Sequence, residues 1–241
     1  SIIAYDEIRM ANMCLAVCNR VNSVSQLHGD ILKTRTFRDF YVISPEKFVA
    51  ITNGITQRRW LAAANPALCG LIHDYIGGGF LKDSRELERL MPLADDPAFI
   101  ADFARVKAQN KRCLAEYVKK TQGLALNPET VFDVQAKRLH EYKRQLLKVL
   151  HILYLYNRFT EDASFSLPQP VTFLFAAKAS PAYHRAKSII HLINVASALV
   201  ESNPRKREAI RVQFLENYNV SLAERLIPAA DISEQLSTAG R

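Results

Sequence analysis

A dense cluster of cations lies in the segment Lys137–Arg144, which reads KRLHEYKR. The apolar run Val131–Gln135 precedes it, and such a run is typical of a buried strand. Ligands of open parallel sheets bind beyond the carboxyl ends of the strands, where this cluster is expected to lie. Lys137, Arg138 and Lys143 are suited to bind one phosphate or two neighbouring phosphates. The alternative is a solvated basic face without a ligand.

The helical pattern that follows the cations, over residues 139–158, favours the phosphate hypothesis. We expect Lys137 and Arg138 at the N-terminus of this helix, where unpaired N–H groups and the helix dipole attract an anion. Cations at a helix start are unfavourable by themselves. A helix that begins with Lys-Arg is therefore expected to bind an anion there.

Two other predicted strands also end in polar or aromatic residues. Lys178 follows the apolar run 171–177, and Tyr218 comes shortly after the apolar run 211–215. An aromatic ring at that place could pack on a planar ligand, although a plain strand-to-helix turn explains it equally well. Lys178 could bind a ligand or be an ordinary surface residue. The convergence of three such strand ends favours one shared ligand site.

The elements that must position these residues alternate between strand and helix, which predicts an α/β fold with a parallel sheet and right-handed crossovers. The chain before residue 123 is predicted to be mainly helical, and Asn65-Pro66 begins one of its helices. A turn is expected at Asn53-Gly54. The predicted strands are 131–135, 171–177 and 211–215, with extended pieces at 40–43 and 47–51, and the predicted helices are 2–20, 58–64, 66–76, 84–92, 97–121, 139–158, 182–201 and 221–226, the last capped by Ser221.

The composition is that of an ordinary globular protein. The 241 residues are 49% hydrophobic and 23% charged, which allows a sizeable core and argues against disorder. The net charge of +8 indicates anionic partners or a basic surface. No apolar run reaches the ~18–20 residues of a membrane span, and the N-terminus lacks the pattern of a signal peptide. We therefore expect no membrane partner and a cytoplasmic location.

Motifs of several other functional classes are absent from the sequence. The six histidines form no HExxH pair and the four cysteines lack zinc spacing, so we predict no metal site and reduced thiols. Gly77–Gly79 lacks a following Lys-Ser/Thr pair, so it predicts a helix end and not a P-loop. No GxGxxG follows a strand, and no nucleic-acid-binding module is recognisable. We expect no nucleic acid as a partner.

Five segments of the chain resemble signature regions of the α-glucan phosphorylases, the glycogen, starch and maltodextrin phosphorylase family. They occur in the family's order and spacing. The resemblance implies a GT-B fold, in which two Rossmann-like domains face a cleft. Residues 1–57 would end the N-terminal domain, and residues 58–241 would form the first part of the C-terminal one, a partial Rossmann-like α/β domain with a parallel sheet preceded by helical segments. The five segments are Thr52–Leu61, Val131–Leu147, Ala177–Lys187, Phe214–Leu222 and Ala229–Gly240.

The resemblance implies a retaining glycosyltransferase that uses pyridoxal 5′-phosphate and orthophosphate to release α-glucose 1-phosphate from an α-1,4-glucan. By resemblance, Arg138 and Lys143 would hold the substrate phosphate, and Lys137 would contact the phosphate of the cofactor. Tyr218 would lie against the cofactor. The three cations would offset the repulsion between two phosphates, which for unit charges ~4 Å apart is ~4 kcal/mol at an effective dielectric of ~20.

Three further residues would contact the glucan according to the same resemblance. Tyr142 would touch a sugar hydroxyl, and Asn53 would form a hydrogen bond to the glucose near its 6-position. Tyr183 matches an aromatic residue near the mouth of the cleft. The intact enzyme is expected to be a homodimer that acts on α-1,4-glucan and orthophosphate.

The family's motif continues beyond Ser237–Gly240 into a Glu-Ala-Ser-Gly-Thr-Gly-Asn-Met-Lys stretch, whose lysine forms the Schiff base with the cofactor. The chain stops at Arg241, before that stretch. We therefore expect an internal fragment that is catalytically inactive by itself and does not bind the cofactor covalently. The alternative from another functional class is a basic module that binds glucan, phosphate or nucleic acid without catalysis. A natural, non-functional truncation is a third interpretation.

Overall fold

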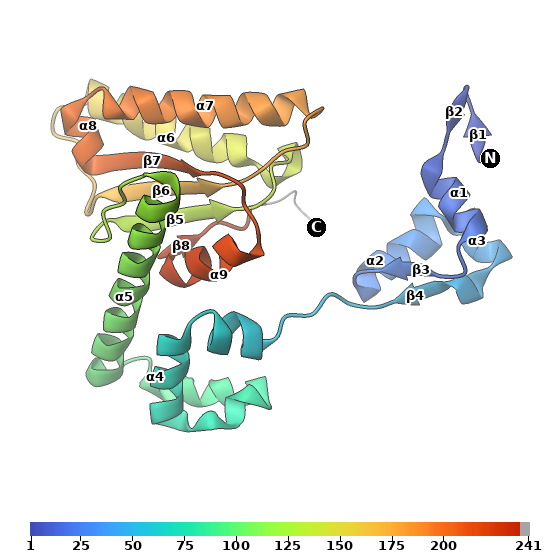
Figure 1. Cartoon of the computed structure of the whole chain (residues 1–241), viewed down its shortest axis with the longest axis horizontal. Helices are drawn as coiled ribbons and strands as arrows, with labels where there is room; N and C mark the ends of the chain where they lie inside the picture. Colours follow the sequence, from blue (N-terminus) through green and yellow to red (C-terminus); the bar gives the residue numbers. More distant parts are fainter. Residues whose placement is uncertain (237–241) are drawn as a thin grey trace. The chain divides into compact units, whose positions relative to one another are not determined.

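A computed structural model of the 241-residue chain describes residues 1–236 and contains two compact units (Figure 1). The first unit comprises residues 1–56, and the second unit begins at Gln57. The predicted boundary, between residues 57 and 58, lies one residue further along the chain. That these units belong to the N- and C-terminal domains of a larger enzyme stays a prediction. The end of the segment Ala229–Gly240, which carries one of the resemblances, lies outside the described residues.

The first unit begins with a short hairpin, so the predicted helix over residues 2–20 is wrong in its first part. Ile3 pairs with Ile8 across two antiparallel strands, and Tyr5 and Asp6 turn the chain between them with φ of 56° and 60°. Ile3 is used in this pairing, and residues 18–20 are not helical either, so the helix has only eight residues, Met10–Val17. The elements of this unit are β1 (Ile3–Ala4), β2 (Glu7–Ile8), α1 (Met10–Val17), β3 (Val21–Ser23), α2 (Gln26–Ile31), a π-helix (Leu32–Thr36), α3 (Arg38–Ile43), a 3-10 helix (Pro45–Lys47) and β4 (Phe48–Ala50).

Two more expectations about the first unit are corrected. Residues 40–43 are not extended but form the end of α3, because a short apolar run fits a helix as well as a strand. The ring of Tyr41 meets that of Phe48 edge-on, with centroids 5.4 Å apart. The extended piece at 47–51 is confirmed as β4, which pairs with β3 in parallel. No turn forms at Asn53-Gly54, since residues 51–56 have no regular structure.

Three helix ends predicted in the second unit, at Asn65, Gly77 and Gly123, are confirmed. Asn65 caps α4 (Pro66–Ile76), and its side-chain oxygen accepts a backbone N–H of the first turn. Gly77 ends α4 with φ of 78°, and Gly123 ends α5 (Pro97–Gln122) with φ of 70°, conformations that favour glycine. The shorter elements nearby are a π-helix at Arg58–Ala63 and 3-10 helices at Gly78–Leu81 and Ser84–Leu93.

A parallel sheet with strand order β7-β6-β5-β8 forms the centre of the second unit. The three predicted strands are confirmed as β5 (Val131–Ala136), β6 (Val171–Ala176) and β7 (Ile210–Leu215). The fourth strand, β8 (Ile232–Ser233), was not predicted because it has only two residues. The winding of the sheet reverses between β5 and β8, and at such a switch point the carboxyl ends of the strands leave a crevice for ligands.

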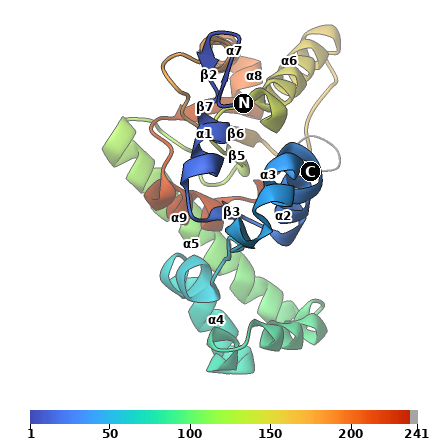
Figure 2. The same ribbon diagram turned by 90° about the vertical axis from the view of Figure 1, so that its right-hand side faces the viewer.

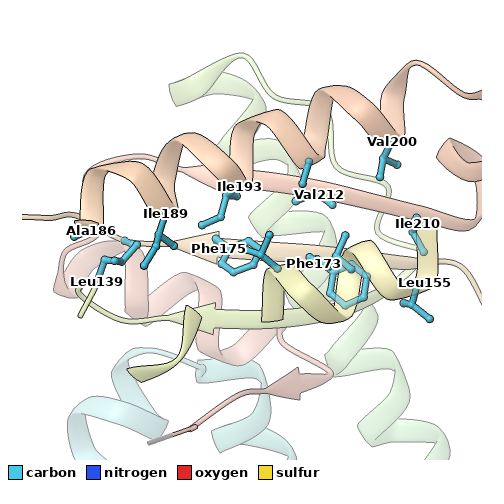
Figure 3. Packing of buried hydrophobic residues seen from close by; sticks show 14 of the residues in the cluster. Leu139, Leu155, Phe173, Phe175, Ala186, Ile189, Ile193, Val200, Ile210 and Val212 are labelled. Carbon is cyan, nitrogen blue, oxygen red and sulfur yellow. The ribbon is translucent and has the colours of Figure 1, made fainter. Parts of the chain in front are cut away.

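Helices cover both faces of this sheet (Figures 1 and 2). On one face lie α6 (Gln145–Glu161) and α7 (His184–Glu201), and Figure 3 shows Phe175 of β6 near Ile193 of α7 and Phe173 near Leu155 of α6. On the other face, Leu174 of β6 packs with α5 and α9 (Val220–Ala229). The short helix α8 (Pro204–Ala209) leads into β7. None of the helices that the structure describes is long and apolar enough to cross a membrane.

The helix after β5 begins later than predicted. The predicted helix 139–158 is α6, which starts at Gln145, so Lys137 and Arg138 do not lie at its N-terminus. Leu139 is buried in the core and its N–H donates to the Lys178 carbonyl at 3.1 Å, which prolongs the strand-like path. A further correction concerns α9: its cap is the side chain of Asn219 and not that of Ser221.

Candidate functional site

The candidate site is the loop of residues 137–144, which joins β5 to α6 at the carboxyl edge of the sheet. The N–H of Lys137 donates to the Ala176 carbonyl at 3.0 Å, so the loop leaves the strand still paired to β6. A 3-10 turn at Glu141–Lys143 follows, and Arg144 adopts a left-handed conformation with φ of 57° before α6 begins. The loop therefore lies beside the switch point between β5 and β8.

Two of the predicted phosphate-binding cations have no anionic partner within the described part of the chain. The guanidinium of Arg138 is exposed and takes part in no ion pair among residues 1–236. The Lys143 ammonium is half-buried, and its described contact is the ring of Tyr142, whose centroid lies 5.6 Å from Nζ. Both charges are therefore available to an anion.

Lys137 is half-buried, as is Lys143. Its Nζ donates to the Leu236 carbonyl at 3.4 Å. Burial lowers the pKa of Lys137, the neighbouring charge of Lys143 lowers it further, and the carboxylate of Glu234 opposes both effects. Two ammonium groups that repel each other in this way create a positive potential, which a bound phosphate would relieve.

The only carboxylate of the loop, Glu141, is neutralised by groups at the start of α7. The Tyr183 hydroxyl donates to Glu141 Oε2 at 2.9 Å, and Arg185 donates to Oε1 at 3.0 Å. These hydrogen bonds, that of Tyr183 above all, hold the pKa of the Glu141 carboxyl below its usual value. Since its charge is balanced by Arg185, Glu141 does not cancel the cations of the loop. The contact also brings Tyr183 to the loop that carries Tyr142.

A buried ion cluster lies beneath the loop, between β5, β8 and α6. Lys148 Nζ lies 2.6 Å from Asp133 Oδ1 and 3.3 Å from Glu234 Oε1, and the lysine side chain is fully buried. Burial raises the pKa of Glu234; the charge of Lys148 opposes this, and the carboxylate of Asp133 adds to it. The cluster ties β8 to β5 and thus fixes both sides of the crevice.

The family model of the carbohydrate phosphorylases matches residues 1–241. The chain belongs to this family. It is 50% identical over 241 residues to a glycogen phosphorylase of Bacillus subtilis (strain 168), a match that covers 100% of this chain and 30% of that relative. It is 47% identical over 238 residues to the muscle form of glycogen phosphorylase of Homo sapiens, and this match covers 98% of this chain and 28% of the relative. This phosphorylase chain thus spans less than a third of the length of these relatives.

The structure brings together some of the predicted site residues of this phosphorylase chain but not all of them. Lys137, Arg138, Tyr142 and Lys143 share one loop, and Tyr183 joins them through Glu141. Tyr218 follows β7, two strands away from β5 in the sheet order. Its side chain packs against the apolar cluster between the sheet and the helices α5 and α9.

Asn53, the predicted contact to glucose, belongs to the first unit of the phosphorylase chain. Its side chain is exposed, and its backbone N–H donates to the Val24 carbonyl at 2.9 Å. The roles assigned to Asn53 and to the residues of the second unit stay predictions.

Three polar residues around the loop were not singled out from the sequence. They are Gln135, Gln145 and Glu234, and the two glutamine side chains are only 1% exposed. One signal in the sequence could have identified Gln135. In the strand Val131–Ala136, polar residues alternate with apolar ones at positions 133 and 135, so a polar stripe faces α6 in a sheet that is covered on both faces.

Proposed function

We propose that this chain supplies the phosphate-binding part of the active site of an α-glucan phosphorylase, which releases α-glucose 1-phosphate from α-1,4-glucan with retention. The observation that carries the proposal is the position of Arg138 and Lys143. Both lie beside the switch point of the sheet, without an anionic partner among residues 1–236. Membership of the carbohydrate phosphorylases and 50% identity to a glycogen phosphorylase support it.

In this proposal the cations act by offsetting charge. Arg138 can bind two phosphate oxygens through its planar fork, and Lys143 contributes a compact charge from the end of the 3-10 turn. A substrate phosphate held in this way would lie near the position where positive charge develops on the sugar ring and would stabilise it. Because Arg185 balances the charge of Glu141, this carboxylate does not weaken the attraction between the cations and the phosphate.

The residues present also fit the phosphate end of pyridoxal 5′-phosphate. Lys137 provides a half-buried ammonium whose charge is disfavoured by burial and by Lys143, so a second anion beside it would be stabilising. Bound there, the cofactor would supply a phosphate group that neighbours the substrate phosphate. Tyr218 would lie against the cofactor, and Tyr142, Tyr183 and Asn53 would contact the glucan. The GT-B arrangement, a homodimer and a cytoplasmic location belong to the same proposal.

Phosphate binding tests the proposal directly. We expect saturable binding of orthophosphate to the 241-residue chain in 31P NMR or calorimetric titrations. Arg138→Ala and Lys143→Ala are each expected to weaken it by about tenfold to a hundredfold, because each removes a charge-assisted hydrogen bond. The matched control is Arg112→Ala, which removes an exposed arginine from α5.

Two outcomes would contradict this proposal. One is equal weakening by Arg112→Ala, which would indicate a diffuse basic surface. The other is salt-dependent binding of random-sequence DNA that phosphate and glucan do not compete with, which would favour a basic binding module instead.

We also expect the 241-residue polypeptide by itself to form no glucose 1-phosphate from maltodextrin, orthophosphate and added pyridoxal 5′-phosphate. The reason is that the Gly-Thr-Gly-Asn-Met-Lys stretch, whose lysine the resemblance assigns to the Schiff base, is not among its residues. Borohydride reduction with the cofactor, followed by intact mass measurement, provides a second check. A stoichiometric adduct at one lysine, or formation of glucose 1-phosphate, would contradict the expectation.

A further inference from the structure

Buried polar side chains lie directly under the cationic loop. Gln135 near the end of β5 and Gln145 at the start of α6 flank the loop on its two sides, and both are 1% exposed. In register with Gln135 on the neighbouring strand is Phe175, which is apolar and fully buried. Burying an amide costs free energy unless it forms hydrogen bonds. The two glutamines are therefore expected to have a specific task.

Each of the two amide groups forms a hydrogen bond to the backbone near the opposite end of the loop. Gln135, which precedes the loop, donates from Nε2 to the carbonyl of Lys143 near its far end, at 3.2 Å. Gln145, which follows the loop, donates from Nε2 back to the carbonyl of Arg138, at 3.4 Å. Since both neighbours are carbonyl oxygens, the NH₂ ends of the amides must face them. The two residues held in this way are the two assigned to the substrate phosphate.

We propose that Gln135 and Gln145 are positioning residues that hold the backbone at Arg138 and Lys143, so that both cations stay aligned for one phosphate. The proposal rests on the proposed function of the loop. The amides do not touch the phosphate themselves; they act through the two backbone carbonyls.

The loop depends on such support because it has few regular hydrogen bonds of its own. In its early part, the N–H of Lys137 donates to β6, and the N–H of Leu139 donates to the Lys178 carbonyl just after β6. Beyond Leu139 it contains one 3-10 turn and then the left-handed Arg144. Long cationic side chains have much rotamer entropy, so a mobile backbone beneath them would lower the affinity for phosphate further.

The geometry of the amides is unusual in one respect. The Oε1 atoms of both glutamines are buried without a hydrogen-bond partner among the described residues. A buried acceptor without a partner is unfavourable, and a residue chosen for stability alone would avoid it. The presence of an amide at both places therefore supports a function of the two NH₂ groups.

The test replaces each amide by a side chain of the same length without a donor. We expect Gln135→Met and Gln145→Met each to weaken orthophosphate binding by about tenfold, with Arg138 and Lys143 unchanged. Binding is followed by 31P NMR titration of the folded 241-residue chain. Amide hydrogen exchange is measured in the same variants, and we expect faster exchange at residues 140–144 but not at Lys137, whose N–H pairs with β6. The matched control is Gln213→Met, in β7 of the same sheet.

The outcomes separate this proposal from the proposed function. If the wild-type chain does not bind phosphate, the proposed function fails, and the exchange data alone decide whether the glutamines hold the loop. If the wild-type chain binds phosphate and both variants bind it equally well, the positioning role is overturned. A purely structural role would lower the unfolding midpoint without changing the phosphate affinity of the folded protein. If one variant does not fold, the other still tests the positioning role independently, because the two glutamines lie on different elements.

Discussion

Replacing Lys148 with methionine is expected to destabilise the second unit by about 3–5 kcal/mol near pH 7, because it leaves buried carboxylates without their partner. Lys148 is fully buried and pairs with Asp133 and Glu234 at 2.6 Å and 3.3 Å. Its ammonium also lies 5.5 Å from the ring centroids of Phe173 and Phe175. Methionine preserves the volume of the side chain but cancels none of the negative charge.

The loss is expected to depend on pH. Burial raises the pKa of Glu234 above 4.5 in the folded chain, although Lys148 opposes the rise. A carboxyl group with a raised pKa contributes stability when it is protonated. That contribution is fully present below the unfolded-state pKa and is lost as the pH rises through the folded-state pKa. Without Lys148 the folded-state pKa rises further. The destabilisation should therefore be largest at neutral pH and shrink as the pH falls toward 4.5.

Urea unfolding followed by far-UV circular dichroism at pH 5 and pH 7.5 measures this effect. The matched control is Lys187→Met on α7, where the lysine is exposed, and its expected change is within about 0.5 kcal/mol. Adding Glu234→Gln to the Lys148→Met variant should recover part of the lost stability, since it removes one of the two buried charges. A Lys148→Met variant as stable as the parent at pH 7.5 would contradict the buried ion cluster.

The sheet and its helices were largely predictable, because their signals are local. Apolar runs identified β5, β6 and β7, and capping residues such as Asn65 and Gly123 identified helix ends. The errors arise where tertiary contacts decide between local alternatives. Leu139 fits a helical pattern, yet it is buried in the core and continues the path of β5. β8 is too short for a periodic pattern and exists because it pairs with β5.

At the candidate site, too, local signals were predictable and tertiary contacts were not. The types of Lys137, Arg138 and Lys143, together with a preceding strand, predicted a cationic cluster at a strand end, and the structure places the three residues there, in a loop. The expectation that a helix N-terminus supports these cations was wrong. What holds the loop instead is a pair of buried amides from both sides and a carboxylate bound to Tyr183 and Arg185. These contacts join residues from different elements, so no spacing in the sequence reveals them.

Replacing Phe175 with alanine is expected to cost about 3–5 kcal/mol of unfolding free energy, the range found for large-to-small changes in tightly packed cores. Phe175 is fully buried in β6, a central strand that pairs with both β5 and β7. Its ring packs in the cluster between the sheet and α6 and α7, as Figure 3 shows. Because both neighbouring strands are held in register, the surrounding chain has little freedom to close the cavity.

Two measurements check this expectation and tie it to the site. Urea unfolding is followed by circular dichroism and by fluorescence of Trp60, the sole tryptophan in the sequence, which lies in the same compact unit. Phe103→Ala, on α5 and 41% exposed, is the matched control and should cost much less. Phe175 is also in register with Gln135, which holds the cationic loop, and its ring faces the Lys148 ammonium. A cavity at this place should therefore speed amide exchange in residues 140–144 as well, whereas the Phe103 change should not. Equal losses for the two alanine variants would contradict a core built on β6.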